Sequence, residues 1–351
     1  MARAMTLAAD GQAQDTPEAL PRSMDALYTK LEAQRVAALR AFWLTSATCV
    51  LLAPLALLPV AGLAFLTIEY PSGSELAALV EMSRDEIEPF VSGAFLGAFA
   101  WFFIGAALLA RFFVRHGRQP VSDYIRNFKA QVFNHLCAVH FPGLAYDPKG
   151  YIRYDEFDAT NLFPYRSDGY NSEDYFAGHV GQTDVYFAEV VAKRERKCFN
   201  DGRLDTCLDE FFRGLVFVAD FHKHFHSTTR LVPRNEKLVK VRGQAPVTME
   251  DPEFEETFIT VSTDQVDARY VLSTSMVARF VDLSRRIPGM RALFKDEKLV
   301  LALPSNRDRF EPSLYRRANS SRQLDRFVRD IQRLLRIVEE LSLNTRIWSK
   351  S

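Results

Sequence analysis

Two long runs of apolar residues dominate the hydropathy pattern of this chain. Residues 41–68 and 89–110 contain no Asp, Glu, Lys or Arg. A helix crosses a hydrocarbon core of about 30 Å with roughly 20 residues, and a single central charge would cost about 2.5 to 3.5 kcal/mol. The pattern therefore predicts two transmembrane helices, joined by a short, acidic external loop over residues 69–88.

The polar residues before the first span give a weaker pattern. Residues 1–21 mix Ala, Gly, Gln, Asp and Pro without apolar periodicity, which is typical of disorder. Met24, Leu27 and Leu31 then recur at helical spacing and predict an amphipathic cytosolic helix over residues 22–40. A cleavable secretory signal has its apolar core nearer the N-terminus, so we interpret residues 41–68 as a retained span.

The residues after the second span predict a linking helix over 111–141 and a folded domain over 142–351. Strand-like alternation occurs in 175–180, 184–193, 211–221 and 228–233, followed by a closing hairpin and a helix from about Arg322 to Leu341. Strands in runs, without regular alternation with helices, are typical of antiparallel pairing. The fold class we predict is α+β, with an N-terminal transmembrane helical hairpin and a mostly antiparallel cytosolic domain that ends in a long helix.

The distribution of basic residues predicts the orientation. Lys and Arg near span ends stay on the cytoplasmic side of the membrane. The loop between the spans holds one, Arg84, whereas the two outer flanks hold nine. These nine are Arg22, Lys30, Arg35, Arg40, Arg111, Arg115, Arg118, Arg126 and Lys129. We therefore expect both termini in the cytoplasm.

Overall composition excludes some classes of function. Acidic and basic residues balance at 44 each, which argues against a dedicated nucleic-acid binder. The four cysteines show no CxxC spacing, so we expect free thiols in a reducing compartment. The signature motifs of P-loop, dinucleotide-binding, serine-hydrolase and zinc-protease sites are absent from the sequence, and no cofactor is predicted.

The sharpest candidate for chemistry is a run of histidines after residue 219. If the strand of residues 211–221 continues, alternation places Asp220, His222, His224 and His226 on one face, where they could bind zinc. Ligands two apart on a strand lie about 6.5 Å from one another, which is wide for a single ion. An ordinary strand with one solvated side is the competing interpretation.

Small residues in the second span predict close helix packing. Gly93, Gly97 and Gly105 recur at helical spacing, and small residues let two helix backbones approach. The simplest partner is the first span of the same chain; self-association through this face is the alternative.

Basic residues recur along the last predicted helix as well. Five arginines follow steps of three and four, at positions 322, 326, 329, 333 and 336. Such a stripe could adhere to an anionic leaflet, or it could form a solvated face paired with Asp325, Asp330 and Glu339.

Four motifs carry a resemblance to a known family. They are GLVFVADFHKHF (214–225), EDPEFEETFITVSTDQVDARYVLS (250–273), FEPSL (310–314) and IVEELSLNTRIW (337–348). In these the chain resembles a bacterial membrane-protein family known only as a domain of unknown function. The resemblance implies two N-terminal spans and a cytosolic domain, and it supplies no activity or catalytic residue.

Taken together, these features predict a bacterial inner (plasma) membrane protein with two spans. We expect a non-enzymatic, membrane-tethered interaction or scaffold module whose partners are the lipid bilayer and another membrane or cytosolic protein. A metal-dependent hydrolase using the His222–His226 face and a subunit of an oligomeric channel or transporter are the alternatives.

Overall fold

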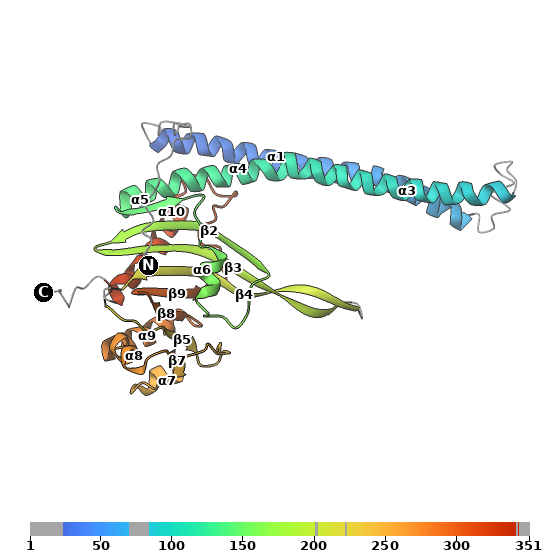
Figure 1. Ribbon diagram of the computed structural model, residues 1–351. Coiled ribbons are helices and arrows are strands. Elements are labelled where there is room, and N and C mark those ends of the chain that lie inside the picture. Colours follow the sequence, from blue (N-terminus) through green and yellow to red (C-terminus); the bar gives the residue numbers. More distant parts are fainter. Residues whose placement is uncertain (1–23, 70–83, 201–202, 222, 342, 344–351) are drawn as a thin grey trace, which may run out of the picture. The chain divides into compact units, whose positions relative to one another are not determined.

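The computed structural model describes residues 24–69, 84–200, 203–221, 223–341 and 343 (Figure 1). The chain divides into two compact units. The first extends to Tyr124 and includes residues 317–319; the second comprises Ile125–Arg316 and the residues from Ser320 onward.

The first unit is built on two long helices, α1 (Met24–Glu69) and α3 (Arg84–Phe113). Both are long and apolar enough to cross a membrane, and few side chains in their apolar windows are buried. Leu44, Leu51 and Leu96 are each more than two-thirds exposed, at 69%, 77% and 73%. The predicted amphipathic helix and the predicted first span form one continuous helix, α1, in which Leu27 and Leu31 near the start are buried and the later leucines are exposed.

Contacts between α1 and α3 explain how α1 accommodates a proline. Pro59 has no N–H, so the carbonyl of Leu55, four residues earlier, loses its helical donor. The indole Nε1 of Trp101 donates to that carbonyl oxygen at 3.3 Å. Because an unsatisfied carbonyl is costly in an apolar environment, α3 replaces the missing bond.

The predicted small-residue face is used in part. A Cβ added at Gly105 would lie 3.1 Å from Cβ of Ala56 on α1, so Gly105 allows the two helices to approach closely. Nothing lies within 4 Å of a Cβ added at Gly93 or Gly97 among the described residues. Packing against the first span thus holds for Gly105, and self-association through Gly93 and Gly97 stays a prediction.

Helical backbone continues from α3 without a loop to His140. The successive segments are the π-helical turn η1 (Val114–Arg118), α4 (Gln119–Phe128), the π-helical turn η2 (Lys129–Phe133) and α5 (Asn134–His140). The linking helix expected over residues 111–141 is therefore present, with two π-type turns that its sequence pattern did not indicate.

The second unit is organised around one antiparallel sheet. Its nine strands in the described residues have the order β1-β2-β3-β4-β9-β8-β5-β7-β6, and every pairing is antiparallel. The strands are β1 (Leu144–Asp147), β2 (Gly169–Val180), β3 (Thr183–Asn200), β4 (Arg203–Asp220), β5 (Thr229–Pro233), β6 (Ala245–Pro246), β7 (Phe258–Ser262), β8 (Arg291–Lys295) and β9 (Lys298–Pro304). The helices that follow α5 are α6 (Tyr154–Ala159), α7 (Pro252–Thr257), α8 (Gln265–Val271), α9 (Thr274–Arg286) and α10 (Ser321–Glu340). The predicted α+β class, with antiparallel strands and a long C-terminal helix, is confirmed.

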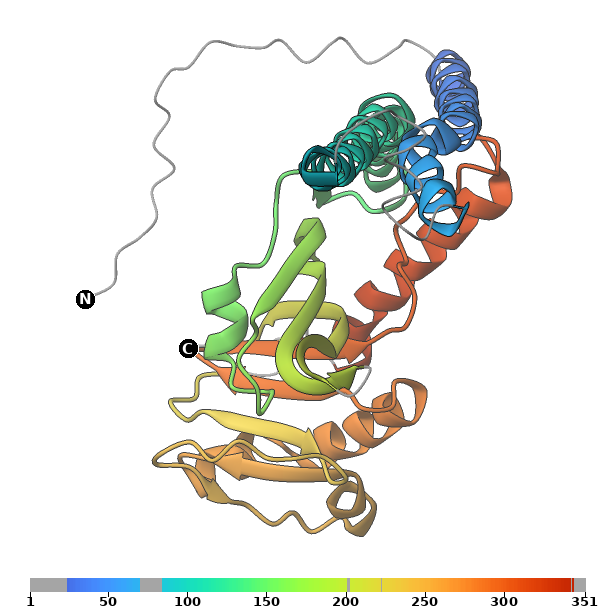
Figure 2. The ribbon, with the colours of Figure 1, turned by 90° about the vertical axis from the view of Figure 1, so that its right-hand side faces the viewer.

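Helices cover the two faces of the central strands (Figure 2). On one face, aromatic rings from the sheet, η2 and α10 interlock, as in Phe133 with Phe176 at 5.7 Å and Phe327 at 5.0 Å between ring centroids. On the other face, α6 and the residues after it pack Phe157 and Leu162 over the sheet. Both faces of the central strands are therefore apolar. Successive side chains of each strand point to opposite faces, so each face packs a different set of residues.

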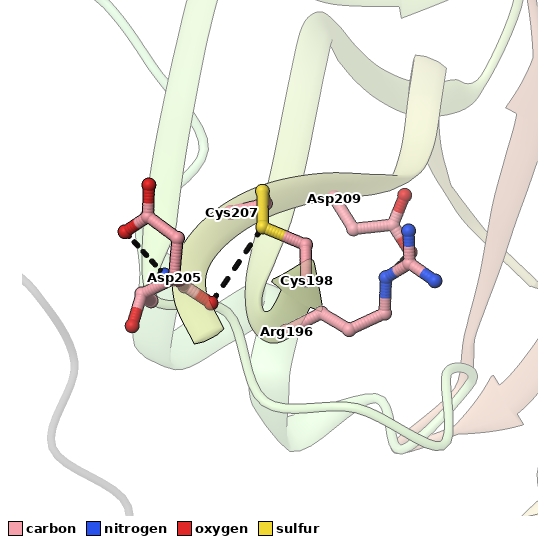
Figure 3. The surroundings of a disulfide bond; sticks show 6 residues. Arg196, Cys198, Asp205, Cys207 and Asp209 are labelled. Atoms are coloured by element: carbon pink, nitrogen blue, oxygen red, sulfur yellow. Dashed lines mark hydrogen bonds and ion pairs between the residues drawn. A yellow bond between two sulfur atoms is a disulfide. The ribbon is translucent and has the colours of Figure 1, made fainter. Parts of the chain in front are cut away.

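Beyond the sheet, β3 and β4 continue as a two-stranded ribbon (Figure 1). β2 pairs with β3 only as far as Lys193, and β9 pairs with β4 only from Gly214. On one side of the ribbon Cys198 and Cys207 form a disulfide with a Cα–Cα distance of 5.9 Å (Figure 3). The expectation of four free thiols was wrong for this pair, because the long hairpin places cysteines nine residues apart on neighbouring strands. Cys49 and Cys137 are free.

Candidate functional site

The predicted histidine face does not form in the way that the pattern suggested. β4 ends at Asp220, so the residues from 223 to 228 are not part of a strand. His224 Nδ1 contacts the carboxylate of Glu297, and the backbone N–H of His226 donates to Asp267 at 3.1 Å. His222 lies outside the described residues. Zinc binding by these residues stays a hypothesis, without the single extended strand on which it was built.

A different group of carboxylates comes together on β2, β3 and the segment after β9. Asp174, Glu189 and Asp308 offer oxygens that all lie within 4.8 Å of one another. Asp174 is buried and Glu189 half-buried, whereas Asp308 is exposed. Three acidic oxygens at this spacing are a donor set that a hard divalent cation prefers.

A β-bulge positions Asp174. The β2–β3 register shifts between Glu173 and Phe176, and Asp174 has a left-handed φ of 54°. Asp residues tolerate this conformation better than most. The bulge turns the Asp174 carboxylate into the interior, where Lys129 Nζ donates at 2.9 Å and the Tyr146 hydroxyl donates at 2.9 Å.

Lys129 links the cluster to a further acid. Its Nζ lies 2.7 Å from the Glu311 carboxylate as well as 2.9 Å from Asp174. A buried ammonium is tolerated only with partners, so η2, β2 and the segment before α10 are joined through one cation.

Burial raises the pKa of the Tyr146 hydroxyl above its ordinary range, and the adjacent Asp174 carboxylate acts in the same direction.

Glu189 is the carboxyl whose titration differs most from that of a free side chain. Burial raises the pKa of Glu189 to about 9, Asp308 and Asp174 act in the same direction, and the hydrogen bond from the Arg309 N–H opposes them. At neutral pH this carboxyl therefore keeps its proton. A divalent cation at the cluster would have to displace that proton.

A small cavity of about 20 Å³ adjoins the cluster, and Glu173, Glu189, Asp308 and Arg213 line it. That volume is enough for about one water molecule or a small ion. The cluster could therefore hold a cation, but its carboxylates already have Lys129, Tyr146 and the Arg309 N–H as partners. The contacts of Lys129 on η2 with Asp174 on β2 join helix and sheet, so the arrangement has a structural role.

A second concave feature lies on the face of the sheet that α6 covers. It is a pocket of about 180 Å³ with an apolar floor that includes Val216, Val218 and Val300. At its margin the Tyr186 hydroxyl donates to Glu156 at 2.5 Å, and the Lys298 ammonium lies 5.9 Å from the Tyr186 ring centre. Ligand pockets for drug-sized molecules occupy about 300 Å³ or more, so this one suits a small group at most.

Sequence reasoning missed the carboxylate cluster because its members are far apart in the chain. Residues 174 and 189 share a hairpin, but 308 is joined to them only through the β4–β9 pairing. The one local signal was an acidic pair, Glu173 and Asp174, within an otherwise alternating strand.

Comparison with known proteins gives a family without an activity. Residues 210–343 match the family described as "Protein of unknown function (DUF3137)". This match, together with the two apolar helices, confirms the resemblance predicted from the motifs. A search of curated proteins finds no match.

Among solved structures, the crystal structure of the mycobacterial trehalose monomycolate transport factor A, TtfA, is similar to this chain at 11% identity. The similarity covers 60% of this chain and 95% of that one, with a TM-score of 0.30.

Proposed function

We propose that this chain is a membrane-anchored interaction module without catalytic activity, held in the bacterial inner membrane by α1 and α3. The observation that carries the proposal is the unbroken helical backbone from Arg84 to His140. It begins in an apolar helix with exposed Leu and Phe side chains and ends at the first strand of the sheet. A folded domain joined in this way to a span stays at the membrane surface, where it meets other membrane proteins.

The charged groups of the sheet domain support a structural role over a catalytic one. Asp174, the buried member of the carboxylate cluster, is neutralised by Lys129, and Glu189 holds a proton at neutral pH. A metal-dependent hydrolase would need these groups free to bind the ion. The imidazole of His224 contacts Glu297, whereas His226 contacts Asp267 through its backbone N–H.

Two observations bear on orientation, and they point in opposite directions. The nine basic residues of the outer flanks favour a cytoplasmic sheet domain. The Cys198–Cys207 disulfide is more typical of an oxidising compartment. We favour the cytoplasmic orientation, because the flanking charges act during insertion, whereas two cysteines on adjacent strands pair whenever an oxidant reaches them.

Orientation and anchoring can be tested in cells. A C-terminal fluorescent protein should be bright and a C-terminal alkaline phosphatase inactive, and the chain should stay in the pellet after alkaline carbonate extraction. Active phosphatase would overturn the cytoplasmic assignment, and release by carbonate would overturn membrane anchoring.

The interaction role needs a separate experiment. Crosslinking in native membranes, followed by purification under denaturing conditions, should recover a distinct partner protein in stoichiometric amounts. A variant with Phe187→Ala, which removes a fully buried ring and destabilises the sheet domain, serves as the control because it should recover less of the partner. Recovery of this chain alone would contradict the proposal.

A further inference from the structure

A stripe of arginines lies on the exposed side of α10. Its members are Arg322, Arg326, Arg329, Arg333 and Arg336, and all five side chains are exposed. At 100° per residue they fall within an arc of about 80° on the helix surface. The opposite side of α10 carries Phe327, Ile331 and Leu334, which are buried against the sheet.

Few acids compensate this stripe. Arg333 lies 3.4 Å from Asp330, which Arg309 also approaches at 3.6 Å. Arg326 donates to the Glu311 backbone carbonyl at 3.0 Å. Arg322, Arg329 and Arg336 have no ion pair in the described part of the chain. In the described part of the chain, Arg333 with Asp330 is the pair that fits the alternative of a face neutralised by its own acids.

A short connection joins α10 to residues that contact α1. In the first unit, the backbone N–H of Ala318 donates to Glu32 on α1 at 2.9 Å, and α10 begins at Ser321. Glu32 precedes residue 41 by nine residues, about 13 Å along a helix. Arg322, the first arginine of the stripe, follows Ala318 by four residues, so the chain connection keeps it within about 14 Å of Ala318. Charges act over a Debye length of about 8 Å in solution.

We propose that the arginine stripe of α10 binds the anionic headgroups of the leaflet in which the chain is anchored. The guanidinium groups are always charged and match phosphate geometry through paired donors. Five exposed charges of one sign exclude a basic partner surface and favour a dense anionic one. The proposal rests on the membrane anchoring proposed above and assigns it a second, electrostatic contact.

The test uses the full chain in lipid nanodiscs that contain phosphatidylcholine and phosphatidylglycerol. The photocrosslinker p-benzoylphenylalanine replaces the exposed Gln332, which borders the stripe, and lipid adducts are identified by mass spectrometry. We expect adducts enriched in phosphatidylglycerol over its share of the disc, by about fivefold or more. The same crosslinker in place of Tyr151, an exposed side chain before α6, should give no such enrichment.

Charge reversal supplies the matched comparison. The triple variant R322E/R329E/R336E should lose the enrichment, whereas K237E/K240E/R242E, an equal change of charge at exposed residues between β5 and β6, should keep it. Adducts in bulk lipid proportions, a crosslink to a second copy, or no lipid adduct in an embedded chain would each overturn the proposal. A chain that fails to enter the discs would instead overturn the membrane anchoring.

Discussion

Two phenylalanines on strand β3, twelve residues apart, experience opposite environments. Phe187 is 0% exposed and stacks with Phe176 at 4.9 Å and Phe217 at 6.0 Å between ring centroids. Phe199 is 81% exposed and lies opposite Leu204, which is 58% exposed. One strand therefore holds a core residue at one end and a solvent-facing ring at the other.

The difference shows what stabilises each half of the β3–β4 hairpin. The half with Phe187 has neighbouring strands on both edges and aromatic rings above it, so burial stabilises it. The half with Phe199 is a two-stranded ribbon, and such ribbons alone are marginally stable in water. In this half the Cys198–Cys207 disulfide links the two strands covalently.

Removal of the buried ring should have the largest effect. Phe187→Ala leaves a cavity among Phe176, Phe217 and Phe310, and we expect a loss of about 3 to 5 kcal/mol in the free energy of unfolding. Thermal unfolding of the full chain in mild detergent, followed by tyrosine and tryptophan fluorescence, measures it. A loss below about 1 kcal/mol would mean that the aromatic cluster contributes little.

Reduction of the disulfide should have a large but local effect. Closing a loop of this length stabilises it by about 3 kcal/mol in the chain-entropy model, a factor of about one hundred in hydrogen-exchange protection. We expect that loss of protection over residues 196–200 and 203–209 in C198S/C207S, with the melting temperature of the sheet unchanged. A global decrease in melting temperature would contradict the division of the hairpin into two independent halves.

A smaller, pH-dependent gain should follow from Glu189→Gln. The folded-state pKa of Glu189 is raised to about 9 from an ordinary value of 4.5, so its stabilising contribution is complete below 4.5 and is lost as the pH rises through 9. Gln resembles the protonated carboxyl and does not titrate. We expect little change at pH 4 and a gain of about 2 kcal/mol near pH 9.

Melting curves over this pH range test the expectation, with Glu195→Gln as the control for an exposed carboxylate of the same strand. An equal response of both variants would mean that the carboxylate cluster does not hold the Glu189 proton.

The smallest effect should come from the exposed ring. Phe199→Ala removes no buried contact, so we expect a change within about 0.5 kcal/mol. The same melting experiment measures it beside Phe187→Ala. A destabilisation above about 1 kcal/mol would show that the ribbon packs against another part of the chain or a second copy.

Local patterns predicted the elements of the sheet well. Alternation predicted the β2–β3 hairpin. Runs of β-branched and aromatic residues predicted β4 and β5, which are buried on both faces in their core parts. The segment 265–271 was not predicted as a helix, although Asp264 caps it through the N–H groups of Val266 and Asp267. It has only two turns, too few for a helical stripe to appear.

Pairings between distant segments were beyond sequence reasoning. Nothing local indicates that β9 lies beside β4, yet this pairing brings Asp308 to Glu189. The disulfide was missed for a related reason: the strands expected over residues 184–193 and 211–221 stop short of both cysteines, whereas β3 and β4 include them. The histidine cluster, conversely, looked specific in sequence because it assumed a strand that ends at Asp220.

The hydrogen bond from Trp101 to the Leu55 carbonyl also affects the axial position of α3 along α1. An axial slide of α3 along α1 by one helical turn would move the indole about 5.4 Å and remove its bond to that oxygen. The proline thus gives one axial register of the helix pair a hydrogen bond that a register one turn away would lose.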